Sequence, residues 1–309
     1  MKVSFGEIKE KIVLLKHSKS IQELSKGYSS DLKFIVTDEL DKKYVLRLME
    51  IKLYKRKKEE FQLLNELRLS RIKCPMPVEI GRIDELGLCY NIMTYIEGEE
   101  AKDYLPYLSE QQQYELGKEA GKELFRIHML PAPLNLESWH IRSIKKHNRY
   151  LEQYKSYNLS FENMERVIHF IEQNNVYLEN RPNQFQHDDF HLGNIILNNQ
   201  RYGGLIDFNN FDWGDPWHDF MKIPIASRVE SVPFSIGQIH GYFNDNIPNE
   251  FWRIYSIYAA MMCFSSIVWS IKSSPQQLEK FMERINLLLQ DHHFFEELEP
   301  TWYKDPERV

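Results

Sequence analysis

Cysteine is scarce in this sequence. Only three of its 309 residues are cysteines, Cys74, Cys89 and Cys263, and they lie far apart. An odd and sparse set of this kind forms neither a disulfide framework nor a zinc site, so we expect a reducing compartment. The segment Met1–Lys16 also lacks the apolar core and the small-residue cleavage site of a secretory signal. These absences together predict a cytoplasmic protein.

The sequence has no excess of basic residues and no long hydrophobic run. Lys plus Arg number 39 and Asp plus Glu number 45, which gives a formal net charge of -6. General nucleic-acid binding needs a basic face, so a nucleic-acid partner is not expected. Serines interrupt the longest hydrophobic stretch, around Ile254–Ile271, and it is better interpreted as a buried helix than as a membrane span. We therefore expect no membrane association.

The first hundred residues have the pattern of an antiparallel sheet. Apolar and polar side chains alternate in Asp31–Thr37 and in Lys43–Met49, and the charged turn between them indicates a hairpin. Two further strands are expected at Val78–Ile83 and Leu86–Tyr95. Between the two pairs, Tyr54–Arg71 has its large apolar residues at helical spacing. Residues 1–95 are therefore predicted to form a β-rich N-terminal region with one helix.

The remainder of the chain has mainly helical periodicity. Ser109 is a plausible N-cap for a helix that ends before Pro131. The other predicted helices are Phe161–Leu178, Phe251–Lys272 and Gln276–Leu289. We place the boundary near Ile96–Glu100, so that residues 96–309 form a helical C-terminal region. The expected fold class is α+β.

One segment carries the residues of a specific chemistry. Asn194 follows Asp189 by five positions, and Asp207 follows Asp189 by eighteen, after a short strand. Phosphoryl transfer needs such a set: one carboxylate orients the attacking hydroxyl, while an amide oxygen and a second carboxylate hold Mg²⁺ against nucleotide phosphates.

The wider motif resembles a known family. His-x-Asp-x-x-x-x-Asn at residues 187–194, Ile-Asp-Phe at 206–208 and Gly-Asp-Pro at 214–216 are similar to the motifs of the aminoglycoside phosphotransferase family. This family contains small-molecule kinases with a protein-kinase-like fold. The resemblance spans roughly residues 20–290 and implies two lobes, an antiparallel sheet lobe and a mainly helical lobe. It also implies transfer of the γ-phosphate of ATP, with GTP as an alternative nucleotide, to a small-molecule hydroxyl.

The resemblance assigns roles to the residues of the motif. Asp189 is the expected catalytic base, and Asn194 and Asp207 are the expected Mg²⁺ ligands. His187 is expected to brace the catalytic loop. Asp215 is expected to cap a helix and to anchor the same loop rather than touch substrate.

The resemblance also assigns nucleotide-binding residues in the first region. Arg47 is expected at the α- and β-phosphates, and Glu60 is expected to pair with it. The remaining candidates form a short loop over the nucleotide and an inter-lobe linker beside adenine: Gly27, Ser29, Ser30, Met93, Thr94 and Ile96.

The chain departs from the family pattern at two positions. Asp188 stands where the family usually has glycine, and Arg47 stands where it often has lysine. Arginine stays charged and binds phosphate in a bidentate way, but it is not equivalent to lysine. No long segment after Asp207 resembles an activation loop, because Gly214-Asp215-Pro216 follows within a few residues. A small molecule is therefore a better expected acceptor than a protein.

Several functions stay open at this point. The acceptor can be an aminoglycoside or another antibiotic, which would imply a resistance role, or a choline-like or sugar compound. A kinase-like nucleotide-binding regulator without turnover is an alternative. A metal-dependent phosphohydrolase could instead use His187, Asp188 and His191.

Overall fold

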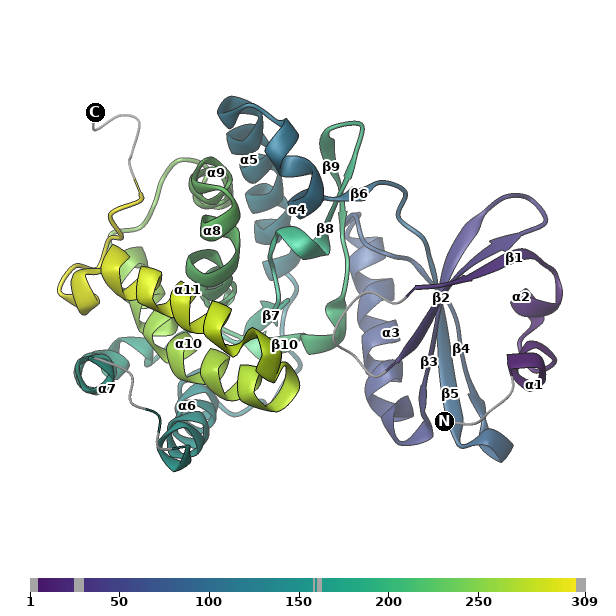
Figure 1. Ribbon diagram of the computed structural model, residues 1–309, viewed down its shortest axis with the longest axis horizontal. Coiled ribbons are helices and arrows are strands. Elements are labelled where there is room, and N and C mark those ends of the chain that lie inside the picture. Colours follow the sequence, from purple (N-terminus) through teal and green to yellow (C-terminus); the bar gives the residue numbers. More distant parts are fainter. Residues whose placement is uncertain (1–4, 25–30, 158, 160–162, 304–309) are drawn as a thin grey trace. The chain divides into compact units, whose positions relative to one another are not determined.

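The computed structural model describes residues 5–24, 31–157, 159 and 163–303. The chain divides into two compact units (Figure 1). Unit 1 contains residues 1–98 and 203–209, and unit 2 contains residues 99–202 and 210–309. The short segment 203–209, which includes Asp207, therefore packs with unit 1, whereas the sequence placed it in the C-terminal region.

Unit 1 is built on a five-stranded sheet with the order β1-β2-β3-β5-β4 (Figure 1). Each strand is antiparallel to its neighbours. The strands and helices of unit 1 are β1 Ser18–Glu23, β2 Leu32–Asp38, β3 Lys43–Glu50, β4 Pro77–Ile83, β5 Leu88–Thr94, α1 Phe5–Lys9, α2 Val13–Lys16 and α3 Tyr54–Leu69. The predicted hairpin, the two later strands and the single long helix between them are confirmed.

The two faces of this sheet differ in character because side chains alternate along each strand. Phe34, Leu46 and Leu48 belong to an apolar core that also includes Ile12 and Leu15 from the α1–α2 region. The residues between them on the strands project to the opposite face. There, cross-strand pairing aligns Lys33, Arg47 and Asn91 in one polar row, and buried leucines of α3 belong to this side of the unit (Figure 1).

Unit 2 is mainly helical, as predicted. Its long helices are α5 Glu110–His128, α6 Trp139–Ser156, α7 Met164–Asn174, α9 Val232–Phe243, α10 Phe251–Ser273 and α11 Leu278–Asp291, and its short ones are α4 Ala101–Tyr104 and α8 Arg228–Glu230. Short strands form two small sheets, with the orders β6-β8-β9 and β7-β10. They are β6 Glu99–Glu100, β7 Gln184–Gln186, β8 Ile195–Asn198, β9 Arg201–Leu205 and β10 Asp212–Gly214. The chain passes back into unit 1 within β9.

Helix α5 begins at the predicted cap. The Ser109 hydroxyl accepts a hydrogen bond from the Gln112 backbone N–H, and the Gln112 side chain accepts one from the Ser109 N–H. This reciprocal capping box satisfies two backbone donors at the helix start. It fixes the first turn of the helix that packs most extensively on α9.

Helices α5 and α9 approach closely at glycines. A Cβ atom on Gly117 or Gly121 would lie less than 3.0 Å from backbone atoms of α9, and one on Gly237 or Gly241 would lie equally close to α5. Each pair is spaced by four residues and therefore lies on one face of its helix. The close contact of the two backbones depends on these glycines.

Gly121→Ala is expected to destabilise the protein by about 1–3 kcal/mol, the usual cost of an overpacked interface. At an exposed helical position, Gly→Ala would instead stabilise the protein by up to about 1 kcal/mol. The sign of the change in unfolding free energy therefore distinguishes a close helix contact from an exposed position. Urea unfolding measures it, with Lys122→Ala at the exposed neighbouring position as the matched control. If the Gly121→Ala variant had a urea midpoint equal to or above that of the wild type, the close approach of α5 and α9 would be contradicted.

Helix α10 is the described helix that is long and apolar enough to span a membrane by length and composition alone. However, 83% of its most apolar 18-residue window is buried inside the protein. The interpretation of this stretch as a buried helix is therefore confirmed.

Candidate active site

The segment between β7 and β8 carries the predicted catalytic residues, and a buried carboxylate anchors it. The backbone N–H groups of His187 and Asp188 donate to Asp219 Oδ2 and Oδ1 at 2.8 and 2.6 Å. The Asp219 side chain also lies 2.9 Å from Nε2 of His128 on α5. Since Asp219 is fully buried, these bonds satisfy its charge and fix the loop entry.

Asp188 occupies a backbone conformation that explains the usual glycine at this position. Its φ is 61°, in the left-handed region that glycine adopts without strain and aspartate tolerates. Its carboxylate lies 3.2 Å from Lys146 Nζ and 3.0 Å from His218 Nδ1. Burial would raise the pKa of Asp188, but Lys146 and His218 outweigh it and hold the pKa well below the usual value. Asp188 is therefore ionised and engaged by α6 and by the segment after β10.

Asp189 is more accessible than its neighbour and faces different partners. Lys222 Nζ lies 2.9 Å and His191 Nε2 3.6 Å from Asp189 Oδ1. Burial alone would raise the pKa of Asp189, but the charge of Lys222 and the contact with His191 hold the pKa well below its usual value. The side chain is 20% exposed, so an ionised carboxylate is presented at the surface of unit 2.

Asn194 lies beside Asp189, as their spacing requires. Its amide Nδ2 donates to the Asp189 backbone oxygen at 2.9 Å and to Oδ2 at 3.2 Å. Because the nitrogen is engaged in this way, the amide oxygen is the atom with which Asn194 would bind a cation. His191 caps the turn between them: Nδ1 accepts from the Gly193 N–H at 3.0 Å, so Nε2 carries the ring proton that faces Asp189.

Asp215 caps a helix and anchors surrounding elements. Its carboxylate accepts from the Trp217 backbone N–H at 3.1 Å, at the start of the 3₁₀ helix Pro216–Met221. Arg181 donates to both of its oxygens, at 2.6 and 2.8 Å, and the Tyr258 hydroxyl donates at 2.8 Å. Its backbone oxygen accepts from Gln186 Nε2 at 2.6 Å, which connects it to the strand that enters the loop.

His187 is fully buried at the start of the loop between β7 and β8. Its ring packs edge-on against Phe190, with 6.3 Å between ring centroids. Its role as a brace of the loop stays a prediction, although its position in the interior of unit 2 suits that role.

In unit 1, Arg47 lies at the centre of a buried charge network. Its Nη2 donates to Asp31 Oδ2 at 2.7 Å, and its Nη1 lies 3.5 Å from Asp207 Oδ1. Burial would lower the pKa of Arg47, but Asp207, Glu60 and Asp31 raise it, so the guanidinium is charged. The 203–209 segment is held to this unit by a 2.8 Å hydrogen bond from the Leu205 N–H to the Lys73 carbonyl.

Glu60 has a different partner from the one predicted. Lys57 Nζ lies 2.9 Å from Glu60 Oε2, and both side chains are buried. Lys57 also donates to Asn209, whose amide donates to Asp207. Among the ion pairs of the described residues, Arg47 therefore pairs with Asp31 and Asp207, whereas Glu60 pairs with Lys57. Lys57 therefore belongs to the buried charge network, whereas its neighbour Lys58 is exposed.

Lys57→Met is expected to destabilise unit 1 by about 3–5 kcal/mol, because it leaves the Glu60 carboxylate buried without its ammonium partner. The double variant Lys57→Met/Glu60→Gln should recover most of that loss, since neither charge then remains. Chemical denaturation measures both, with Lys58→Met at the exposed neighbouring position as control. Additive losses in the double variant would show that the pair is not coupled.

Of the six remaining nucleotide-binding candidates, three lie in the described part of unit 1 and three lie outside it. Met93 and Thr94 end β5, and Ile96 follows two residues after it, all in unit 1. The Thr94 N–H donates to the Met76 carbonyl at 2.9 Å, and the Met76 N–H donates to the Thr94 hydroxyl at 2.9 Å. These two bonds hold the end of β5, where the linker begins, to the residue that precedes β4. Gly27, Ser29 and Ser30 lie outside the described residues.

The residues that a phosphohydrolase would use do not form a metal site. Within the described part of the chain, no group of three or more His, Cys, Asp and Glu side chains has an arrangement that could hold a metal ion. Asp188 is directed to Lys146 and His218 instead, and His191 caps the loop. The arrangement does not support that alternative.

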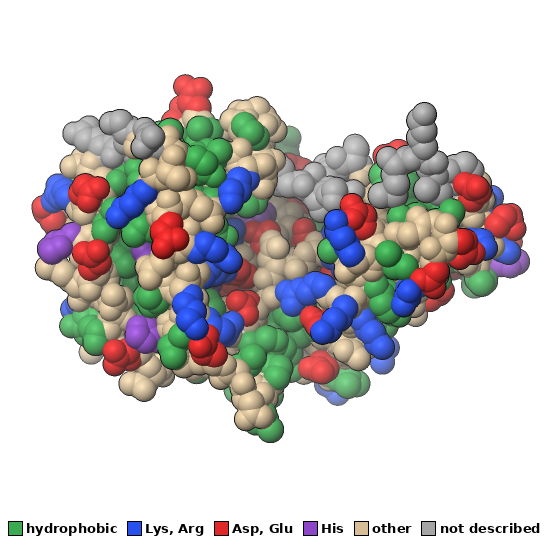
Figure 2. All heavy atoms as spheres, turned by 90° about the horizontal axis from the view of Figure 1, so that it is seen from below, with side chains coloured by type: hydrophobic (Ala, Val, Ile, Leu, Met, Phe, Trp, Pro, Cys, Tyr) green, Lys and Arg blue, Asp and Glu red, His purple; other side chains and the backbone are tan. Residues whose placement is uncertain are grey.

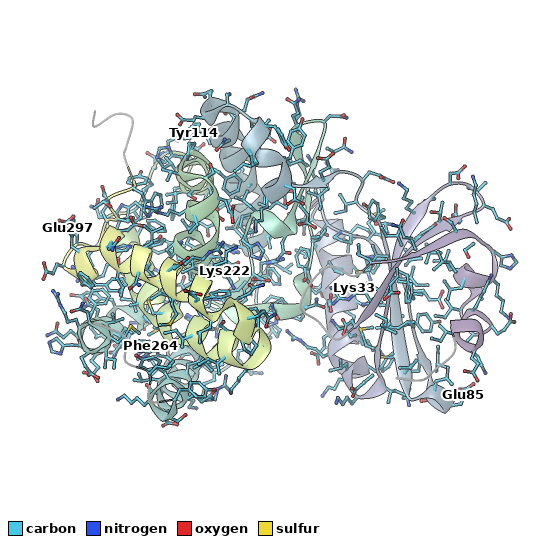
Figure 3. The ribbon with its side chains drawn as sticks, viewed as in Figure 1. Lys33, Glu85, Tyr114, Lys222, Phe264 and Glu297 are labelled. Atoms are coloured by element: carbon cyan, nitrogen blue, oxygen red, sulfur yellow. The ribbon has the colours of Figure 1, made fainter. Side chains whose placement is uncertain are left out.

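Four residues that position the site were not identified from the sequence. Asp219 could have been identified from the local sequence, because it follows Asp215 by four positions in a turn-rich segment. Lys57 also had one, since it precedes Glu60 by one helical turn. Lys146 and Lys222 reach the loop from α6 and from the end of a 3₁₀ helix, and no local pattern connects them with it (Figure 3 labels Lys222).

An antiparallel-sheet unit followed by a helical unit that carries the Asp189–Asn194 loop is the architecture of the protein-kinase-like fold. The sequence matches the model of the phosphotransferase enzyme family, APH, over residues 20–252. The chain therefore belongs to this family, as its motifs predicted.

Solved structures of aminoglycoside phosphotransferases have the same fold. The gentamicin complex of APH(2")-IIa is 19% identical, with 94% of this chain and 97% of that chain covered and a TM-score of 0.67. The streptomycin–ATP complex of APH(2")-IIa is 22% identical, with 92% and 99% covered and a TM-score of 0.65. The GDP complex of wild-type aminoglycoside 2'-phosphotransferase-IIIa is 14% identical, with 88% and 92% covered and a TM-score of 0.65. No curated protein matches the chain.

Proposed function

We propose that the protein transfers the γ-phosphate of Mg²⁺-ATP to a hydroxyl group of a small molecule. The observation that carries this proposal is the Asp189 carboxylate, ionised and partly exposed, with the Asn194 amide fixed against it at 3.2 Å. This pair supplies an acceptor for the hydroxyl proton and, on the same short loop, an oxygen ligand for a hard cation.

The acceptor hydroxyl donates a hydrogen bond to Asp189, and its oxygen attacks the γ-phosphorus. The bond between that phosphorus and the bridging oxygen of the β-phosphate breaks, ADP leaves, and the hydroxyl proton passes to Asp189 and then to solvent. Asp189 is a weak base because its pKa is held low. Its main contribution is therefore orientation of the nucleophile, which suits a loose transition state with little proton transfer.

The donor set suits Mg²⁺ and a nucleotide. Asn194 and Asp207 would offer an amide and a carboxylate oxygen, which are hard ligands, and phosphates and water would complete the coordination. Bound Mg²⁺ would offset charge on the phosphates. Arg47, held by Asp31, would bind the α- and β-phosphates, and Thr94 and Ile96 would contact adenine. Similar solved structures hold ATP, ADP or GDP, so GTP is an alternative donor.

The proposed acceptor is a small molecule in the cytoplasm. Similar phosphotransferases are solved with gentamicin and with streptomycin. An aminoglycoside or another antibiotic is therefore one class to test, and a resistance role would follow only from turnover of such a compound.

The experiment is Mg²⁺-ATP consumption by the purified protein against aminoglycosides, macrolides, choline-like alcohols, sugars and their anionic derivatives. We expect consumption that depends on both an acceptor and Mg²⁺. Tight nucleotide binding without consumption for any acceptor would instead favour the nucleotide-binding regulator.

A further inference from the structure

The carboxylates at the start of the catalytic loop are already neutralised by lysines. Lys146 lies 3.2 Å from Asp188 and Lys222 lies 2.9 Å from Asp189. Two negative and two positive charges therefore balance within this cluster. Carboxylates without a cationic partner attract a polycationic acceptor most strongly. Because Asp188 and Asp189 are each paired with a lysine, this cluster has no net negative charge to attract such an acceptor.

Helix α6 extends the positive charge away from this cluster. Its eighteen residues include five Lys or Arg and only one acid, Glu152. Arg142 lies 3.0 Å from Asp212 at β10, and Lys146 follows one turn later on the same helix face. Continuing along that face leads to Arg149, Tyr150 and Gln153. This face of α6 therefore carries three cations and no acid: Arg142 and Lys146 pair with Asp212 and Asp188, and Arg149 follows one turn further on.

A pocket begins one helical turn beyond Lys146. It has a volume of about 300 Å³ and lies between α6 and α10, both in unit 2. Its lining residues are Arg149, Tyr150, Gln153, Val268, Trp269, Lys272 and Ser273. All seven are described residues, and they include two cations, two aromatic rings and no acid. Figure 2 shows the molecule from below, and in that view Lys and Arg side chains lie among Asp and Glu side chains on the surface of unit 2.

We infer that the acceptor is an anionic alcohol, a hydroxyl compound that carries a carboxylate or a phosphate group. Arg149 and Lys272 would bind the anion, and Tyr150 and Trp269 would flank the carbon skeleton. Arginine suits this task because its planar guanidinium binds carboxylate and phosphate in a bidentate way. One turn of α6, a rise of about 6 Å, separates Tyr150 from Lys146, and Lys146 pairs with Asp188, the residue before the proposed base. We place the anionic end of the acceptor in this pocket on that basis. This inference rests on the proposed function.

The test uses two series of acceptors, and the members of each share a carbon chain length and differ in charge. One is gluconate, glucose 6-phosphate, glucose and glucosamine, and the other is glycerate, glycerol 3-phosphate and glycerol. The polycation gentamicin is added to them. We expect kcat/KM to be at least tenfold higher for an anionic compound than for the neutral compound of the same series. We expect the lowest kcat/KM for the cationic compounds, glucosamine and gentamicin. Whether the carboxylate or the phosphate compound is preferred identifies the anion. Preference for glucosamine or gentamicin would overturn the inference.

Variants locate the effect in the pocket. The double variant Arg149→Gln/Lys272→Gln should raise the KM for the anionic acceptor about tenfold or more, with kcat and the KM for ATP little changed. Both positions are exposed, so folding should not depend on them. Lys155→Gln, an exposed lysine of α6 outside the pocket, is the matched control. A double variant that behaves like this control would contradict the inference.

A binding measurement separates the two proposals. Calorimetric titration of the protein with gluconate and with glucose 6-phosphate, without nucleotide, should show binding that the double variant loses. If binding is lost in this way but no acceptor supports ATP consumption, the proposed function fails and the anion site stands. If neither anionic compound binds and neither is phosphorylated, the inference fails, whatever the turnover with other acceptors.

Discussion

Asp189→Asn is expected to lower turnover by about 10²–10⁴, because the neutral amide orients the acceptor hydroxyl less well than an ionised carboxylate does. The amide is close in shape to the carboxylate but cannot take the hydroxyl proton, and it lacks the charge that Lys222 stabilises at 2.9 Å. Affinity for Mg²⁺-ATP should change little, because Asp189 is not among the proposed nucleotide ligands. Steady-state kinetics and nucleotide titration on the same preparation measure both quantities.

Asp212→Asn provides the matched control for this experiment. Asp212 is also a carboxylate of unit 2 paired with a cation, Arg142 at 3.0 Å, but it lies in β10 outside the catalytic loop. We expect it to keep turnover within a few-fold of the wild type. Full activity of the Asp189 variant, or an equal loss in both variants, would show that the role of Asp189 is assigned wrongly.

Asp207→Asn should weaken binding of Mg²⁺-ATP and lower turnover by an amount on the order of 10²–10³, comparable with the removal of one charge-stabilising group. The residue has φ of 65°, a left-handed conformation that asparagine tolerates, so backbone strain should not contribute. The variant also removes the carboxylate that lies 3.5 Å from Arg47. Nucleotide affinity measured with Mg²⁺ and with EDTA separates the two effects.

The Mg²⁺-dependent part of nucleotide affinity is the decisive quantity for Asp207. Asp84→Asn, at the exposed turn between β4 and β5, is the control because its carboxylate pairs with Arg82 in the same unit. It should leave the affinity unchanged. If the Asp207 variant bound Mg²⁺-ATP as tightly as the wild type, its role as a metal ligand would be excluded.

The features that the sequence predicted well are local ones. Alternation with period two locates β2 and β3, and the spacing of five residues puts the Asn194 amide beside Asp189. The strand positions and the Asp189–Asn194 contact each depend on residues close together in the sequence, so they can be predicted without knowledge of the tertiary packing. The cap at Ser109 is another local signal, since its two hydrogen bonds span three residues.

The features that the sequence missed depend on contacts distant in sequence. Helix α6 was not predicted because its buried face carries Ser143, His147 and Tyr154 rather than an aliphatic stripe. Helix α9 contains Gly237 and Gly241, which weaken helix propensity and are needed only because α5 packs against them. The ion pairs of Asp188 and Asp189 likewise bring together residues 33 to 42 positions apart.

The most direct test of the account is to identify where the γ-phosphate goes. Purified protein is incubated with ATP labelled at the γ-phosphate, Mg²⁺ and each candidate acceptor, and the products are identified by mass spectrometry. We expect a phosphate ester on the acceptor hydroxyl, formed in equal amount with ADP and lost in Asp189→Asn. Label found only as inorganic phosphate, at a rate that no acceptor changes, would contradict it.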